Sequence, residues 1–131
     1  NDVHTTVLSQ IICCQFLQSC NMAGHLAALQ KLYRGKCDLM VQGLRQHLPR
    51  AEFVTPEGGF FLWCVLPKGI DLMAFVRAAG EAKVAVVPGT TFLPDPGVPC
   101  TAVRLNFSAP GNQQIVTGIE RLGKVLDAFL R

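Results

Sequence analysis

The sequence predicts an α+β fold in which two lead-in helices precede a small mixed sheet covered by helices on one face. Two stretches before residue 49 repeat apolar side chains every three to four positions. Three β-branched or aromatic runs then follow between residues 60 and 107, with helical periodicity between the first two and after the last. A chain of 131 residues is long enough for one such domain and too short for two of ordinary size.

Residues 1–48 contain the two predicted lead-in helices. Asn21 is a suitable N-cap for the second helix, over residues 22–48, which Pro49 ends. At about 1.5 Å per residue this helix is about 40 Å long, so we expect it to lean on a neighbouring domain. The first helix, over residues 4–19, has apolar positions that fit one helical face: Val7, Leu8, Ile11, Ile12, Phe16 and Leu17.

Residues 49–131 contain the predicted sheet and its covering helices. The apolar run 60–66 is typical of a strand buried on both sides, or on one side and under a partner. A capped helix over 71–82 separates it from a second strand at 84–87. The third strand, 102–107, alternates strictly, with Val103, Leu105 and Phe107 on one face and Arg104 and Asn106 on the other.

A proline-rich loop and a closing helix complete the predicted domain. The loop covers residues 93–101, and either Ser108 or Asn112 caps the helix that follows the last strand. Its apolar face is Ile115, Ile119, Leu122, Leu126 and Phe129. We therefore expect lead-in helices at 1–48, which join another part of a longer protein, and an α+β small domain at 49–131, within a single domain overall.

Charge content limits the class of partner. Charged residues make up 16% of the chain, against about 25% in an average soluble domain. No apolar run approaches the ~18–20 residues of a membrane-spanning helix, so we expect the surplus apolar surface to be covered by protein and not by lipid. The net charge is +3 and the basic residues are scattered, which does not favour a nucleic-acid partner.

The sequence offers no catalytic or metal-ligating constellation. None of its three histidines has a serine or cysteine in a nucleophile-elbow context, and Gly58-Gly59 and Gly111 lack the lysine and the serine or threonine of a phosphate loop. Its six cysteines show no C-x-x-C spacing, so zinc is not expected. We interpret them as reduced structural thiols of a cytoplasmic type of compartment, with Cys13, Cys14 and Cys64 inside apolar runs.

Arg104 is the candidate binding residue. It is a permanent cation within an apolar strand, and buried arginine is rare unless it is paired. One interpretation is a structural salt bridge to an acidic residue, or an arginine on a solvated edge. The other is a planar donor that receives a carboxylate through two parallel hydrogen bonds. Composition alone favours the structural interpretation.

Four ordered blocks carry a resemblance that extends over residues 49 to about 126. They are PEGGFFLW at 56–63, PKGID at 67–71, VAVVPGTTF at 84–92 and VRLNFS at 103–108. In this order and with these gaps they resemble the C-terminal small domain of fold-type I pyridoxal-phosphate aminotransferases. The branch they resemble contains 2-aminoadipate, kynurenine and broad-specificity amino-acid transaminases. Lys83 is a small departure, because the family often has glycine after this helix.

The resemblance implies a site and partners. Arg104 would grip the α-carboxylate of an amino-acid substrate, and Phe92 with Phe60 or Phe61 would line the side-chain pocket; plain core packing is the alternative for these phenylalanines. The intact enzyme would be a homodimer, cytoplasmic or mitochondrial, that transfers an amino group from an amino acid to a 2-oxo acid. Its own large domain would hold pyridoxal 5′-phosphate, so this chain alone is expected to bind no cofactor and to be inactive.

Two alternatives stay open at this point. The same domain occurs in transcription regulators behind a DNA-binding head, and a stand-alone α+β module for ligand binding or protein interaction would not catalyse anything. The residues encoded before Asn1 would distinguish them.

Overall fold

Antiparallel pairing organises the sheet of the computed structural model, which describes residues 6–131. The strands are β1 (Glu52–Phe53), β2 (Phe61–Val65), β3 (Val87–Pro88) and β4 (Ala102–Asn106), in the order β1-β2-β4-β3. The α+β class is confirmed, but the expectation of a mixed sheet is wrong, because all three pairings are antiparallel. Strands β2 and β3 do run parallel, as a β-α-β order predicts, yet β4 lies between them and pairs with both.

The helices follow the predicted ranges closely. They are α1 (Val7–Ser19), α2 (Met22–His47), α3 (Leu72–Glu81) and α4 (Asn112–Phe129). The 3-10 turn η1 (Gly89–Phe92), which follows β3, was not predicted. Asn21 caps α2 as expected, since its Oδ1 accepts a hydrogen bond from the Gly24 N–H at 3.2 Å. Tyr33–Arg131 forms one compact unit and the chain up to Leu32 forms another. Positions 4 and 5 of the first predicted helix lie outside the described residues.

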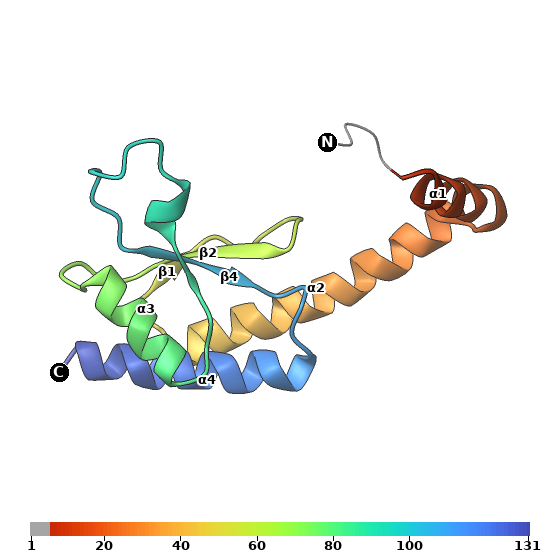
Figure 1. Cartoon of the computed structure of the whole chain (residues 1–131). Helices are drawn as coiled ribbons and strands as arrows, with labels where there is room; N and C mark the ends of the chain where they lie inside the picture. Colours follow the sequence, from red (N-terminus) through yellow and green to blue (C-terminus); the bar gives the residue numbers. More distant parts are fainter. Residues whose placement is uncertain (1–5) are drawn as a thin grey trace. The chain divides into compact units, whose positions relative to one another are not determined.

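The core lies on one face of the sheet. Helices α3 and α4 and the part of α2 from residue 33 onwards all pack against that face, while η1 lies on the other side (Figure 1). This confirms the predicted one-sided covering. Among the described residues the core holds no buried polar or charged side chain. Its fully buried large side chains are Leu44, Leu48, Leu62, Cys64, Phe75, Val103, Phe107, Leu122 and Leu126.

Strand β2 is buried on one face only. Leu62 and Cys64 are fully buried, whereas Phe61 and Trp63 are 42% and 41% exposed. Of the two interpretations of the apolar run 60–66, burial on both sides within this chain is therefore wrong. Alternation along the strand places Phe61 and Trp63 on the face that the helices leave open.

The predicted strand at 84–87 shortens to Val87–Pro88 because α3 uses the backbone before it. The Lys83 N–H donates to the Gly80 carbonyl at 3.0 Å, and the Val84 N–H donates to the Ala79 carbonyl at 2.8 Å. These two bonds form a Schellman motif that ends the helix. The Val84 N–H is consequently not available for pairing with β4.

The start of α4 also differs from the expectation. Neither Ser108 nor Asn112 caps this helix: Gly111 is the N-cap, and its N–H donates to the Gln114 Oε1 at 2.8 Å. Ser108 instead donates its N–H and its hydroxyl to the Asn106 Oδ1, both at 2.7 Å. Lys36 Nζ donates to the carbonyls of Ser108 and Pro110 at 3.1 and 2.8 Å. The chain is therefore held firmly where it leaves β4.

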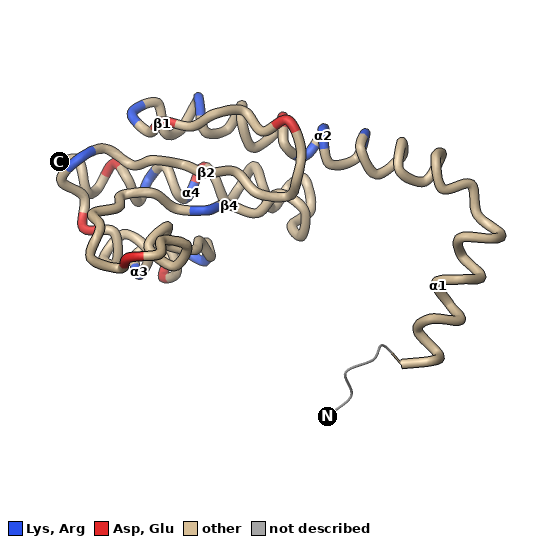
Figure 2. The backbone as a smooth tube through the Cα atoms, turned by 90° about the horizontal axis from the view of Figure 1, so that it is seen from above, with Lys and Arg blue, Asp and Glu red and all other residues tan. Residues whose placement is uncertain are grey.

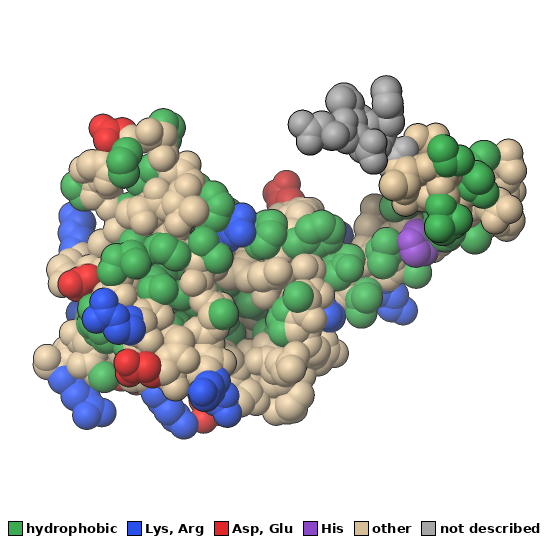
Figure 3. All heavy atoms as spheres, viewed as in Figure 1, with side chains coloured by type: hydrophobic (Ala, Val, Ile, Leu, Met, Phe, Trp, Pro, Cys, Tyr) green, Lys and Arg blue, Asp and Glu red, His purple; other side chains and the backbone are tan. Residues whose placement is uncertain are grey.

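Helix α1 has no buried residue and no charged residue. Its apolar side chains stand exposed, from 36% at Phe16 to 70% at Val7, and they give the helix its green surface in Figure 3. Cys13 and Cys14 are exposed on this helix, whereas Cys64 is buried in the core. Within residues 6–131, no helix is long and apolar enough to span a membrane.

Replacing Lys83 by glycine should stabilise the domain. Lys83 has φ +65°, a left-handed conformation that strains any side chain with a Cβ and suits glycine. We expect Lys83→Gly to raise the free energy of unfolding by about 0.5–1 kcal/mol in denaturant titrations. Arg77→Gly, an exposed position inside α3, is the matched control and should lower it by about 1 kcal/mol. Equal losses in both variants would contradict this account of the helix end.

Burial of Cys64 should make the free energy of unfolding depend on pH in the alkaline range. Desolvation raises the pKa of the Cys64 thiol from 9.0 to about 12. Above about pH 9 the unfolded chain loses this proton while the folded chain keeps it, so the free energy of unfolding falls as pH rises. Cys64→Ala removes the linkage, so the stability difference between wild type and variant should shrink from neutral pH toward about pH 10. A difference that stays constant in urea titrations would contradict it.

Candidate functional site

Arg104 lies at the centre of the open face of the sheet. It is the one charged residue of β4, the blue section of that strand in Figure 2. In the antiparallel register it stands opposite Trp63 on β2 and opposite Val87 on β3. Because Val103 and Leu105 point into the core, alternation turns the Arg104 side chain away from the helices, as the sequence predicts.

Two aromatic rings hold the Arg104 guanidinium. Its Cζ lies 3.9 Å from the centroid of Phe61 and 4.3 Å from the centroid of Phe92. Phe61 comes from β2 and Phe92 from the end of η1, so the structure joins three of the four site residues that the sequence predicts. Cations at such distances are attracted to the negative faces of the rings, by about 0.5–2 kcal/mol for each contact.

The guanidinium has no acidic partner in the described part of the chain. Within residues 6–131 it makes no hydrogen bond and no ion pair; the ion pair present there joins Lys124 to Glu120 on α4, at 2.9 Å. The structural salt bridge that composition favours is therefore not found among these residues. The aromatic faces attract the cation, but its five N–H donors have no protein acceptor among residues 6–131.

Phe60 lies apart from this cluster. The residue is 48% exposed, and its ring packs edge-to-face on Tyr33 of α2, with 5.2 Å between the ring centroids. No contact joins it to Arg104. Of the two alternatives Phe60 and Phe61, Phe61 is the one beside the guanidinium.

Trp63 and Gly89 belong to the site, although sequence reasoning did not select them. The Trp63 ring meets Phe92 edge-to-face, with 6.2 Å between centroids. A Cβ placed on Gly89 would lie 2.7 Å from Trp63 Cη2, so the glycine backbone packs directly on the indole ring. The two-residue spacing of Phe61 and Trp63 on one strand was the available signal for Trp63.

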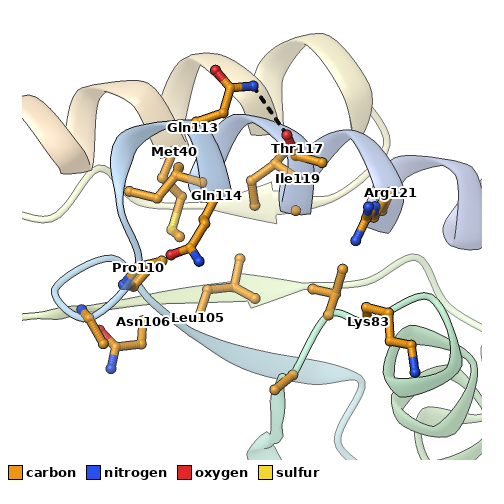
Figure 4. Close-up of a pocket in the computed structure, with 15 residues that line it drawn as sticks. Met40, Lys83, Leu105, Asn106, Pro110, Gln113, Gln114, Thr117, Ile119 and Arg121 are labelled. Carbon is orange, nitrogen blue, oxygen red and sulfur yellow. Dashed lines mark hydrogen bonds between the residues drawn. The ribbon is translucent and has the colours of Figure 1, made fainter.

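A second concave feature lies on the helix side of the sheet. This groove of about 660 Å³ runs between α4, the end of β4 and residues 83–85. Its apolar lining includes Met40, Leu105 and Ile119, and Figure 4 shows Lys83 and Arg121 toward the same end of the groove. Arg104 does not line it, so the groove and the candidate site are separate.

The lysines of this chain do not fit a pyridoxal-phosphate site. Four of the five, Lys31, Lys68, Lys83 and Lys124, are exposed. The remaining lysine, Lys36, donates to two backbone carbonyls. Lys83 lines the groove described above, but it is exposed to solvent. No group of three potential metal ligands occurs among the described residues.

The fold matches that of known enzymes. The chain is 32% identical over 130 residues to a 2-aminoadipate transaminase of Thermus thermophilus, covering 98% of this chain and 32% of that protein. A crystal structure of the α-aminoadipate aminotransferase from Thermus thermophilus, complexed with N-(5′-phosphopyridoxyl)-L-leucine, superposes with a TM-score of 0.91 and 31% identity over 98% of this chain and 33% of that one. A Pyrococcus horikoshii kynurenine aminotransferase gives 0.89 and 30% over 99% of this chain and 32% of that one.

This chain belongs to the fold-type I aminotransferases, as their C-terminal domain. No family model matches the chain. This aminotransferase domain spans about one third of the length of the curated relatives it matches. Weaker matches are bacterial HTH-type transcriptional regulators, one of them from Staphylococcus aureus at 27% identity over 87% of this chain and 25% of that protein.

Proposed function

We propose that this domain binds the α-carboxylate of an amino-acid substrate through Arg104, within an aminotransferase that passes an amino group from an amino acid to a 2-oxo acid. The observation that carries the proposal is a guanidinium held by two aromatic rings with no acidic partner among residues 6–131. The similarity to aminotransferases supplies the reaction class.

The chemistry of Arg104 suits a carboxylate. Arginine stays charged at physiological pH and presents parallel N–H donors that match the two oxygens of a carboxylate. Phe61 and Phe92 restrict the side chain before substrate arrives, which lowers the entropy lost on binding. The Arg104 backbone is part of the central strand β4, which is hydrogen-bonded to β2 on one side and to β3 on the other.

The remaining parts of the reaction belong to the rest of the parent protein. Its large domain would hold pyridoxal 5′-phosphate, which supplies the electron sink for amino transfer. The exposed aromatic face around Arg104 would form one wall of the cleft between the two domains, and closure of that cleft would exclude water. A homodimeric parent in the cytoplasm stays a prediction.

A second candidate function rests on the regulator matches. In a transcription regulator the same Arg104 would bind an amino-acid ligand without turnover. The matches at 24–27% identity are weaker than those to aminotransferases at 32%. A stand-alone binding module is supported by neither set.

Arg104→Lys should lower kcat/KM for amino-acid substrates in the parent enzyme. Lysine keeps the charge but lacks the planar donor pair, so kcat/KM should fall by the equivalent of about 2–5 kcal/mol. Amine substrates without a carboxylate should lose far less, and folding should be nearly unchanged. Arg121→Lys, on the exposed side of α4, is the matched control and should leave kcat/KM unchanged. Equal losses for amines and amino acids, or an unfolded variant, would make Arg104 a structural residue.

The isolated chain should not hold pyridoxal phosphate on one lysine. Its exposed lysines lack the desolvated surroundings that activate a lysine toward carbonyl groups. Borohydride reduction in the presence of pyridoxal phosphate, followed by peptide mapping, should give sparse labelling spread over several lysines. A single lysine labelled at stoichiometric yield would overturn this expectation.

A further inference from the structure

We infer that Gly89 and Trp63 form a seat that positions Phe92 and, through Phe92, the Arg104 guanidinium. Gly89 is then a positioning residue for carboxylate recognition, although it does not touch the substrate-binding group. The inference rests on the proposed function of Arg104.

Position 89 requires glycine because neighbouring atoms leave no room for a Cβ. It is absent from the glycines with positive φ, so its backbone conformation suits other residues. A Cβ at this position would lie 2.7 Å from Trp63 Cη2, 2.8 Å from Cys100 Sγ and 2.9 Å from the Ala102 carbonyl oxygen. The last of these atoms belongs to the backbone of the central strand, which cannot yield easily. Because a shift of Trp63 alone would leave the contact with the Ala102 carbonyl, alanine at 89 must displace the start of η1.

Trp63 contacts both ends of η1. The far edge of its indole packs on Gly89, where the turn begins, and its ring meets Phe92, where the turn ends, at an interplanar angle of 68°. Upstream, the chain is fixed by the pairing of Pro88 with Val103. A displacement at Gly89 consequently passes through one short turn to Phe92, whose ring centroid lies 4.3 Å from the Arg104 Cζ.

Gly123 provides a matched control on the opposite side of the sheet. In α4, a Cβ on Gly123 would lie 2.7 Å from the His47 carbonyl oxygen and 2.8 Å from the His47 Cβ. Gly123→Ala thus introduces the same degree of crowding as Gly89→Ala, but between α4 and α2. Both variants should lower the unfolding midpoint, and only Gly89→Ala should disturb Arg104.

The first measurement uses this chain alone. The Phe61 and Phe92 rings should shift the Arg104 Hδ protons upfield in NMR spectra, and Trp63, as the single tryptophan, reports on the seat by its fluorescence. Phe92→Leu measures how much of that upfield shift comes from the Phe92 ring. Gly89→Ala should lose most of this contribution, and it should change the Trp63 emission. Gly123→Ala should keep both signals. An unaltered Arg104 signal in Gly89→Ala, or an equal change in Gly123→Ala, would overturn the seat.

If Gly89→Ala does not fold, Trp63→Phe replaces it in the same measurement. Phenylalanine keeps an aromatic ring on β2 but lacks the indole edge that Gly89 packs on, so the Arg104 upfield shift should again decrease. If Trp63→Phe retained the upfield shift of the Arg104 Hδ protons, the positioning role of Trp63 and Gly89 would be wrong.

The second measurement uses the full-length enzyme that contains this chain. Gly89→Ala should raise KM for amino acids about 10- to 100-fold, with little change in kcat, because a misplaced binding group mainly weakens substrate binding. Gly123→Ala should leave KM unchanged. An Arg104 signal that moves without any change in KM would support the seat and overturn the carboxylate role of Arg104, so the two proposals fail separately.

Discussion

Arg104, a cation with no acidic partner among residues 6–131, constrains the open face of this domain. Arg104 sits on the central strand, where a charge needs stabilisation, and within residues 6–131 the structure provides aromatic faces for it. Cation–π attraction stabilises the charge and leaves its N–H donors free, which an ion pair would not do. The register of β2 on β4 and the close packing of η1 on Trp63 both serve this arrangement.

The two faces of the sheet have separate tasks. The helix side contains the buried apolar core, with no buried polar or charged side chain in the described part, and it accounts for the stability of the unit. The other side exposes Phe61, Trp63 and Phe92 beside Arg104, each more than 40% exposed. A monomer rarely leaves so many large aromatic side chains together at its surface, and their position around a cation fits a wall of a binding cleft.

The domain corresponds to only one part of the aminotransferases that it resembles. This chain spans about one third of its aminotransferase relatives, and its lysines do not fit a cofactor site. The domain provides a rigid support for Arg104. Its parts are the antiparallel central strand β4, the turn η1, whose Gly89 packs on Trp63, and the segment after β4, which Asn106 and Lys36 hold by hydrogen bonds. Such a support can present Arg104 in a constant orientation.

The sequence by itself determined the helices, the alternation of β4, the unusual lysine at the end of α3 and the candidacy of Arg104, because each depends on neighbours within a few positions. The antiparallel sheet was not determined, since a β-α-β order does not show that β4 inserts between β2 and β3. Nor could local pattern separate Phe61, which contacts Arg104, from Phe60, which packs on Tyr33. The roles of Trp63 and Gly89 come from contacts between segments distant in sequence, and only the tertiary structure decides which distant residues meet.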